Sequence, residues 1–171
     1  MSGEAVTVRD AREDDAAAFA RVHERCWTES YAGIADATWL TRRPLRDRIE
    51  DWVAIVRDHA VELRAAEGED RRTIGFVSFG ASRDEDAEAG TGEIIALYVD
   101  PARQRDGAGT ALLERAVADL RAQGFARATL WTLEGNAPAR RFYAAHGWKQ
   151  ASGRKEHRSL GAHEVRYARD L

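Results

Sequence analysis

One stretch, residues 92–113, most constrains what this chain can fold into. Its sequence, GEIIALYVDPARQRDGAGTALL, opens with an almost wholly apolar run that Gly92 and Asp100-Pro101 bound. Such a run predicts a strand that is buried on both faces. Apolar residues then recur at helical spacing and predict a helix. They are Leu112, Leu113, Ala116, Val117 and Leu120. The stretch is therefore expected to fold as strand, tight loop and helix.

The loop at residues 102–109 has the features of an anion site. It carries Arg103, Arg105, Gly107 and Gly109. Backbone N–H groups at a helix start lack internal partners, and the helix dipole favours negative charge there. Glycines let a ligand approach that backbone closely. The loop thus suits phosphate, although Gly-x-Gly at a strand-to-helix turn is also compatible with turn chemistry alone. No Gly-Lys-Ser/Thr follows, and the third glycine of a dinucleotide fingerprint would fall at Leu112, so neither a P-loop nor a Rossmann-type site is indicated.

Two blocks of the sequence resemble the GCN5-related N-acetyltransferase (GNAT) superfamily. Residues 104–109, QRDGAG, resemble its Q/R-x-x-G-x-G/A signature, with LYVDP before them and TALLERAV after them. Residues 130–148, LWTLEGNAPARRFYAAHGW, resemble its L-x-V-x-x-x-N-x-x-A-x-x-x-Y-x-x-x-G-F segment. The blocks stand in the family's order, and the close match covers residues 92–150.

The resemblance implies one N-acetyltransferase domain over residues 1–171. The implied fold is mixed α/β: a central, twisted, mostly antiparallel sheet of about six to seven strands, about four flanking helices, and a splayed strand pair that holds the cofactor. The residue pattern gives a matching order of strand, helices, a run of strands, helix, strand, helix and strands. The length also favours a single domain with a sizeable core.

Acetyl-coenzyme A is the donor that the resemblance implies. Its pyrophosphate would lie on the amides of the 102–110 loop, and its pantetheine arm on the backbone of the preceding strand. The residues expected to bind it are Leu97, Tyr98, Val99, Gln104, Arg105, Asp106, Gly107, Ala108, Gly109, Thr110, Asn136 and Tyr143. Asp106 departs from the family's preference for a basic or neutral residue, so its carboxylate is expected to point to solvent. Asn136 is expected to contact the arm, to cap its helix, or both.

Glu93 occupies the position of the general base in family members that use a glutamate. An amine with a pKa of ~10 is mostly protonated at neutral pH and must lose a proton before it attacks a thioester. By the two-residue period of a strand, Glu93 should share a face with Ile95, Leu97 and Val99. The alternative is a solvated glutamate at a strand end, with another residue or an ordered water as the base.

Tyr143 matches the family tyrosine that protonates the leaving thiolate. A phenol with a pKa of ~10 is a reasonable proton donor to the thiolate of a thiol with a pKa of ~8.5. The alternative is a helix aromatic that packs beside Phe142. Trp27 and Tyr31 fall in the region that helps form the acceptor pocket in the family, and are expected to bind substrate; packing of a helix connection is the alternative, and one residue can do both.

The acceptor is expected to be a primary amine on a small molecule or on a peptide or protein, acetylated by direct attack in a ternary complex. A coenzyme A-binding module without catalysis is the alternative, against which the presence of Glu93 and Tyr143 argues. The acidic loop 83–92 is either solvated or attracts a cationic acceptor. The sequence leaves the oligomeric state open, a homodimer included.

Composition and charge bear on the remaining classes of partner. A net charge of −3 gives no footprint for nucleic acid or an anionic membrane. No apolar run approaches the ~20 residues of a membrane span, and the acidic start lacks the apolar core of a signal peptide. The lone Cys26 is expected to be a buried helix residue and fits a reducing cytoplasm. The histidines show no ligand spacing, so no metal is expected.

Overall fold

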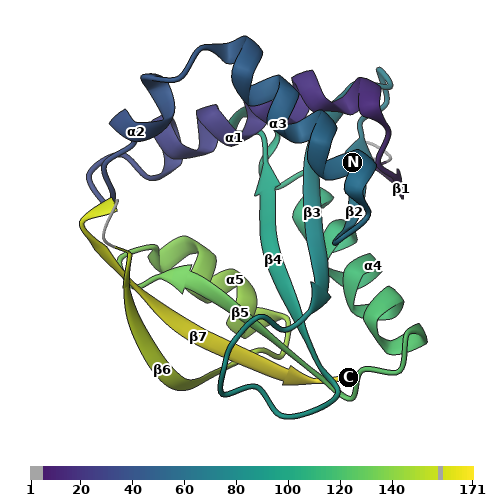
Figure 1. Ribbon diagram of the computed structural model, residues 1–171, viewed down its shortest axis with the longest axis vertical. Coiled ribbons are helices and arrows are strands. Elements are labelled where there is room, and N and C mark those ends of the chain that lie inside the picture. The colour runs from purple at the N-terminus through teal and green to yellow at the C-terminus, as the bar shows by residue number, and fades with distance from the viewer. Residues whose placement is uncertain (1–5, 158–159) are drawn as a thin grey trace.

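The computed structural model describes residues 6–157 and 160–171, and a seven-stranded sheet runs through it (Figure 1). The strand order is β1-β2-β3-β4-β5-β7-β6. The strands are β1 (Thr7–Asp10), β2 (Glu62–Glu67), β3 (Thr73–Ala81), β4 (Thr91–Val99), β5 (Arg127–Leu133), β6 (Lys149–His157) and β7 (Ala162–Asp170). β4 and β5 are parallel, and every other neighbouring pair is antiparallel. The prediction of a mixed, mostly antiparallel sheet is confirmed.

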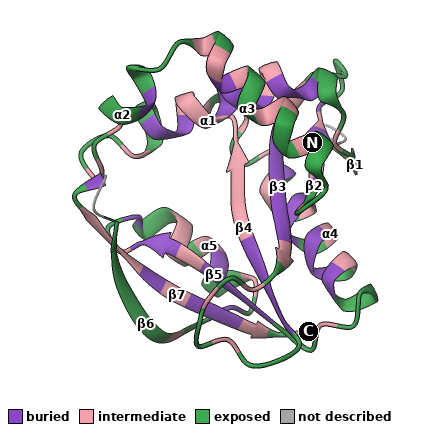
Figure 2. Cartoon of the chain, viewed as in Figure 1, coloured by how far each residue is buried: buried purple, intermediate pink, exposed green. Residues whose placement is uncertain are grey.

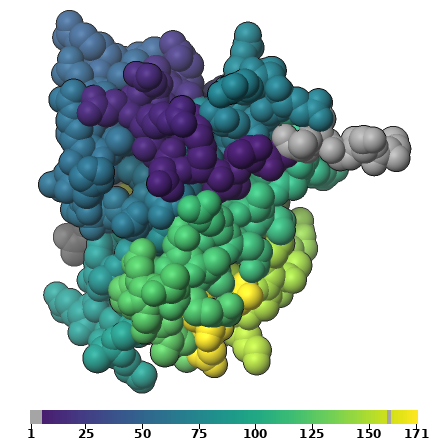
Figure 3. Space-filling model, turned by 90° about the vertical axis from the view of Figure 1, so that its right-hand side faces the viewer, coloured from purple at the N-terminus to yellow at the C-terminus, as the bar shows by residue number. Residues whose placement is uncertain are grey.

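Helices cover both faces of the sheet. The α-helices are α1 (Ala16–Arg25), α2 (Thr38–Thr41), α3 (Leu45–Asp58), α4 (Ala108–Ala122) and α5 (Ala137–Ala145). Phe19 of α1 packs with Phe76 of β3 on one face, whereas Leu112 of α4 packs with Val77 of β3 on the other. The outer side of α4 lies at the surface below the first strand and helix, with the end of β7 beside it (Figure 3). About four helices are expected from the sequence, and the described residues form five α-helices, because α2 is an additional helix of a single turn.

β4 and β5 are paired only over their first residues. Thr91–Ile94 pairs with Arg127–Leu130, and beyond this point the strands diverge while β5 stays on β7 (Figure 1). The first part of β4 is buried, and residues 95–99 are only half-buried (Figure 2). The prediction that this strand is buried on both faces is therefore wrong for its second half.

A β-bulge lies where the two strands part. Ile94 pairs with Phe79 and Ala96 pairs with Ser78, so Ile95 has no partner on β3. A bulge bends its strand and increases the local twist. The bulge therefore places the bend of β4 at the start of the splay.

The bulge also changes which side chains of β4 share a face. Residues opposite each other in antiparallel strands lie on the same face, and the β3–β4 register puts Glu93 with Tyr98. Leu97 and Val99 lie on the other face, where they pack against the α4 cluster. The prediction that Glu93 shares a face with Leu97 and Val99 is wrong, because the extra residue reverses the alternation. Glu93 instead faces the side of the sheet that α1 covers.

Candidate active site

The end of the loop between β4 and α4, from residue 105 on, presents amides without internal partners. Gly107 precedes α4 with a φ of 86°, and Arg105 has a φ of 80°. Among the described residues, the amides of residues 105–110 donate to no backbone carbonyl, and the next amide, of Ala111, donates to the Gly107 oxygen at 3.0 Å. A Cβ added at Gly107 would meet no protein atom within 4 Å. Successive free amides of this kind form an anion-binding concavity.

The side chains of this loop hold it against its neighbours. Gln104 donates to the carbonyl of Val99 and to the hydroxyl of Ser30, both at 3.5 Å. Asp106 accepts from Nε of Arg103 at 2.9 Å, and its side chain is 33% exposed. The predicted exposure of Asp106 is thus partial, because its carboxylate forms an ion pair with Arg103. The pairing offsets the repulsion that a free carboxylate would exert on a bound phosphate.

α5 brings Tyr143 to the splay. The helix starts at a cap, in which the Asn136 side chain accepts from the Ala139 amide at 3.2 Å, so the capping role of Asn136 is confirmed. Tyr143 is 8% exposed, and burial raises its pKa. The centroid of its ring lies 5.4 Å from that of the Phe142 ring. Within the described part of the chain its hydroxyl makes no hydrogen bond, which leaves it available to a ligand.

Two further phenols lie near Tyr143. Burial raises the pKa of Tyr31, and the nearby phenols of Tyr98 and Tyr143 raise it further. Burial likewise raises the pKa of Tyr98, whose ring centroid lies 6.5 Å from that of Tyr31. The sequence suggested only the backbone of Tyr98 as functional. The bulge at Ile95, which turns this side chain toward α1, leaves no recognisable signal in the sequence.

Trp27 and Tyr31, the residues expected to bind substrate, lie next to each other. Their ring centroids are 4.7 Å apart. Nε1 of Trp27 donates to Nε2 of His23 at 3.0 Å and to the hydroxyl of Tyr98 at 3.3 Å. The pair is thus packed into an aromatic cluster and also borders the face of the sheet that carries Glu93.

His23 makes the stability of this cluster depend on pH. Burial, followed by the nearby charge of Arg48, lowers its pKa from 6.5 to about 4. The folded state therefore binds fewer protons than the unfolded state between these values, and stability falls as the pH drops through this window. The loss is about 3 kcal/mol in total. We expect His23→Gln to remove most of it, which denaturant unfolding at pH 7 and pH 4.5 measures. An equal loss in both proteins would contradict this assignment.

Glu93 lies at the closed end of the splay and is held by Arg83. The glutamate is 2% exposed. Its carboxylate accepts from the Arg83 amide at 2.9 Å, from Nε at 3.1 Å and from a terminal guanidinium nitrogen at 2.7 Å. The Arg83 side chain is 62% exposed. Glu93 is thus not the solvated strand-end residue of the alternative interpretation. Sequence reasoning missed Arg83, because the two residues meet only across the β3–β4 hairpin.

The acidic β3–β4 loop is pinned onto the sheet. Asp84 accepts from Nε1 of Trp131 at 2.9 Å, and Arg166 of β7 pairs with Asp86 at 2.7 Å. The loop crosses in front of β5 and β7 (Figure 1). Asp84 and Asp86 are therefore paired rather than freely available to attract a cationic acceptor, and the loop closes the end of the site near Glu93.

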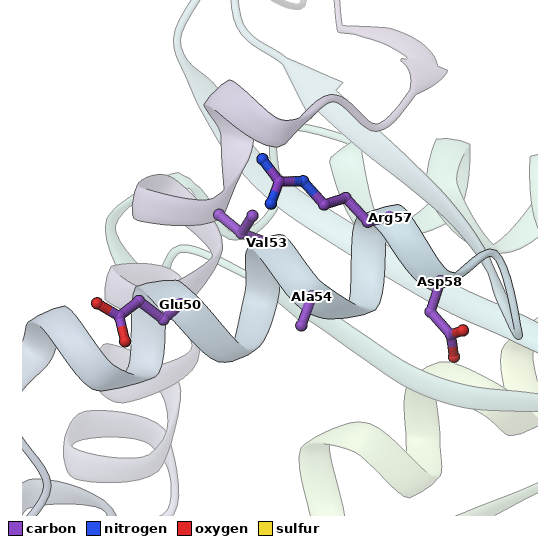
Figure 4. A pocket seen from close by; sticks show the side chains of 5 residues that line it. All are labelled: Glu50, Val53, Ala54, Arg57 and Asp58. Carbon is purple, nitrogen blue, oxygen red and sulfur yellow. The ribbon is translucent and has the colours of Figure 1, made fainter.

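Other features lie outside this site. An open hollow of about 480 Å³ runs along α3, lined by residues of that helix alone (Figure 4). These are Glu50, Val53, Ala54, Arg57 and Asp58. Cys26 is buried as predicted, and its thiol donates to the Val99 carbonyl at 3.2 Å. Burial raises the pKa of this thiol to about 12. Residues 6–157 and 160–171 contain no cluster of metal-ligating side chains, and none of their helices is long and apolar enough to cross a membrane.

Comparisons with known proteins identify the family of this chain and structures that share its fold. The model of the acetyltransferase (GNAT) family matches residues 13–148. The N-acetyltransferase YuaI of Bacillus subtilis, itself uncharacterised, is 33% identical over 82% of this chain and 79% of its own. PaiA N-acetyltransferase from Thermoplasma acidophilum in complex with coenzyme A superposes with a TM-score of 0.77 at 20% identity, over 98% of this chain and 99% of that one. YncA from Salmonella typhimurium, with its cofactor acetyl-CoA, gives 0.73 at 22% identity, over 98% and 94%.

Proposed function

Because the chain belongs to the acetyltransferase (GNAT) family and is thus an acyltransferase, we propose that it moves an acetyl group from acetyl-CoA to a primary amine by direct attack in a ternary complex. One observation carries the proposal: β4 stops pairing with β5 after Ile94, and the loop that follows β4 has unpartnered amides at residues 105–110. The whole chain acts as one domain.

The donor spans the loop and the open edge of β4. The pyrophosphate lies on the amides of residues 105–110, where a phosphate also gains from the dipole of α4. The pantetheine arm lies along the backbone of residues 97–99, from which β5 has diverged and where the side chains of Cys26 and Gln104 bond the Val99 carbonyl. The two structures that contain coenzyme A or acetyl-CoA support this assignment through their shared fold.

Glu93 receives the proton of the acceptor ammonium, directly or through water. A buried carboxylate that is paired with a single exposed arginine can exchange that partner for another cation. The ammonium replaces the guanidinium of Arg83, transfers its proton, and leaves a neutral amine with a free electron pair. Tyr98, on the same face as Glu93, and Tyr31 form the wall above this amine.

Tyr143 assists departure of the thiol. The amine nitrogen forms a bond to the thioester carbon, the carbon–sulfur bond breaks, and the sulfur takes the phenolic proton. The nitrogen then gives up its extra proton, directly or through water, to the phenolate, which restores Tyr143 and leaves a neutral amide. Because burial raises the pKa of Tyr143, the phenol is protonated at neutral pH and ready to donate. The acceptor is a small-molecule or a peptide amine, and the free, buried Cys26 fits a cytoplasmic protein.

A thermal-shift screen followed by an acceptor panel tests the function. We expect coenzyme A to stabilise the protein, whereas NAD and ATP do not. Release of free thiol from acetyl-CoA with an amine of the panel then demonstrates transfer. Stabilisation without thiol release over a broad panel would instead favour a binding module, and stabilisation by NAD or ATP alone would contradict both.

Gly107→Ala tests the phosphate loop. Because a Cβ at this position meets no protein atom, we expect only the strain of a positive φ, about 1–2 kcal/mol of stability. The same methyl group projects toward the bound phosphate, so coenzyme A affinity should fall by about tenfold or more. Gly124→Ala is the matched control, since Gly124 has a φ of 91° in open space at the other end of α4. Equal coenzyme A affinities of the two variants in calorimetry would contradict the assignment.

A further inference from the structure

A hydrogen-bonded chain links the end of α5 to the start of α4. Nδ1 of His146 lies 2.7 Å from the carbonyl oxygen of Phe142, and Nε2 lies 3.0 Å from the hydroxyl of Thr110. The imidazole also packs against the Phe142 ring, with centroids 4.4 Å apart and the two planes tilted by 45°. Phe142 in turn lies against Gly109, whose added Cβ would be 3.5 Å from the ring. The imidazole is therefore held in place from both helices.

This geometry fixes the protons of the neutral histidine. A carbonyl oxygen only accepts, so Nδ1 of His146 carries the hydrogen and donates it to Phe142. Nε2 then has a lone pair, and the Thr110 hydroxyl donates to it. A hydroxyl has a single hydrogen, so in this state Thr110 presents only lone pairs to an approaching phosphate. Two acceptors that face each other repel.

We propose that His146 takes up a proton when the coenzyme A pyrophosphate binds, an inference that rests on the proposed function. A proton from solvent adds to Nε2, which then donates to the oxygen of Thr110, and the Thr110 hydroxyl turns to donate to a phosphate oxygen. The relay makes His146 a positioning residue and places a positive charge behind the phosphate site. The C-terminal end of α5 also favours a cation at this place.

The charged groups around His146 are paired or exposed to solvent, so His146 is the group that takes up the proton. On α4, Glu114 follows Thr110 by one turn and pairs with Arg169 of β7 at 2.9 Å, so their charges offset each other. On the loop, Asp106 is paired with Arg103. On α5 itself, Arg141 is exposed to solvent. Proton uptake therefore couples the affinity for coenzyme A to pH, and binding strengthens as the pH falls.

Calorimetric titration with coenzyme A, in buffers of low and high ionisation enthalpy, measures this uptake. His146→Asn keeps a donor for the Phe142 carbonyl and removes Nε2. At pH 7 we expect the wild-type protein to take up on the order of half a proton more than this variant. Between pH 8 and pH 6 the affinity of the wild type should rise about fivefold more than that of the variant. The ligand's own phosphate, with a pKa of about 6, contributes equally to both and cancels.

Three further variants isolate the relay. Thr110→Val should abolish the extra uptake, and Thr110→Ser should retain it. His59→Asn, at an exposed residue with a φ of 51° that suits asparagine, should match the wild type. Equal uptake in the wild type and His146→Asn, with both binding coenzyme A, would overturn the inference and leave the proposed function intact. Absence of binding to the wild type would overturn both.

Discussion

Tyr143→Phe is expected to lower turnover about 100-fold while coenzyme A affinity changes little, because only the proton for the leaving sulfur is lost. The ring remains and still packs against Phe142, and the removed hydroxyl has no hydrogen bond to another described residue. The fold should therefore lose little stability. Thiol release under saturating acetyl-CoA measures turnover, and calorimetry with coenzyme A measures affinity.

Tyr167→Phe is the matched control for this change. Tyr167 is another buried tyrosine, its ring centroid 6.4 Å from that of Tyr143, but its hydroxyl accepts from Arg140 at 3.2 Å. Loss of that bond should cost about 1 kcal/mol of stability without affecting turnover. Unchanged turnover in Tyr143→Phe would show that the residue only packs, and similar losses in both variants would point to a general disturbance of the core.

Glu93→Gln is expected to reduce kcat/KM for the amine by about 100-fold or more at neutral pH, with the largest loss at low pH. Glutamine accepts no proton, so the variant depends on the neutral fraction of the amine in solution. That fraction rises about tenfold for each pH unit below the amine pKa of ~10. The pH–rate profile of the variant should follow this slope from pH 6 to pH 9, whereas the wild-type profile stays flatter. A profile identical to that of the wild type would remove Glu93 as the base.

Arg83→Met separates catalysis from anchoring of the β3–β4 loop. The ion pair between Arg83 and Glu93 would also be expected if Glu93 only tied this loop to β4. Methionine keeps an unbranched apolar stem and removes the charge, while the amide of residue 83 can still bond the carboxylate. If Glu93 is the base, Arg83→Met should retain turnover and lower KM for the amine, because the competing cation is gone. If Glu93 is an anchor, both variants should be impaired alike.

The sequence predicts best those features that local chemistry determines. Asn136 caps α5 because a short polar side chain before a proline suits a helix start, and Gly107 starts α4 because its φ of 86° favours glycine. The placement of the Cys26 thiol in the core likewise follows from residue type. These features depend on neighbours in the chain, and the same is true of both family motifs.

Features that depend on pairing between distant segments could not be predicted from neighbouring residues in the sequence. The extra residue at Ile95 is defined only by its missing partner on β3, so a strict alternation assigned Glu93 to the wrong face. Arg83 becomes relevant only once the hairpin closes on Glu93. In each case the geometry, rather than the residue type, sets the role.

The short junction between β4 and β5 has a consequence for the protein when no donor is bound. With only Thr91–Ile94 joined to β5, the rest of β4 presents an open strand edge of the kind that other chains can extend. A pantetheine arm laid along this edge would act as a surrogate strand and cap it. An edge capped in this way would no longer be open to pairing with another chain.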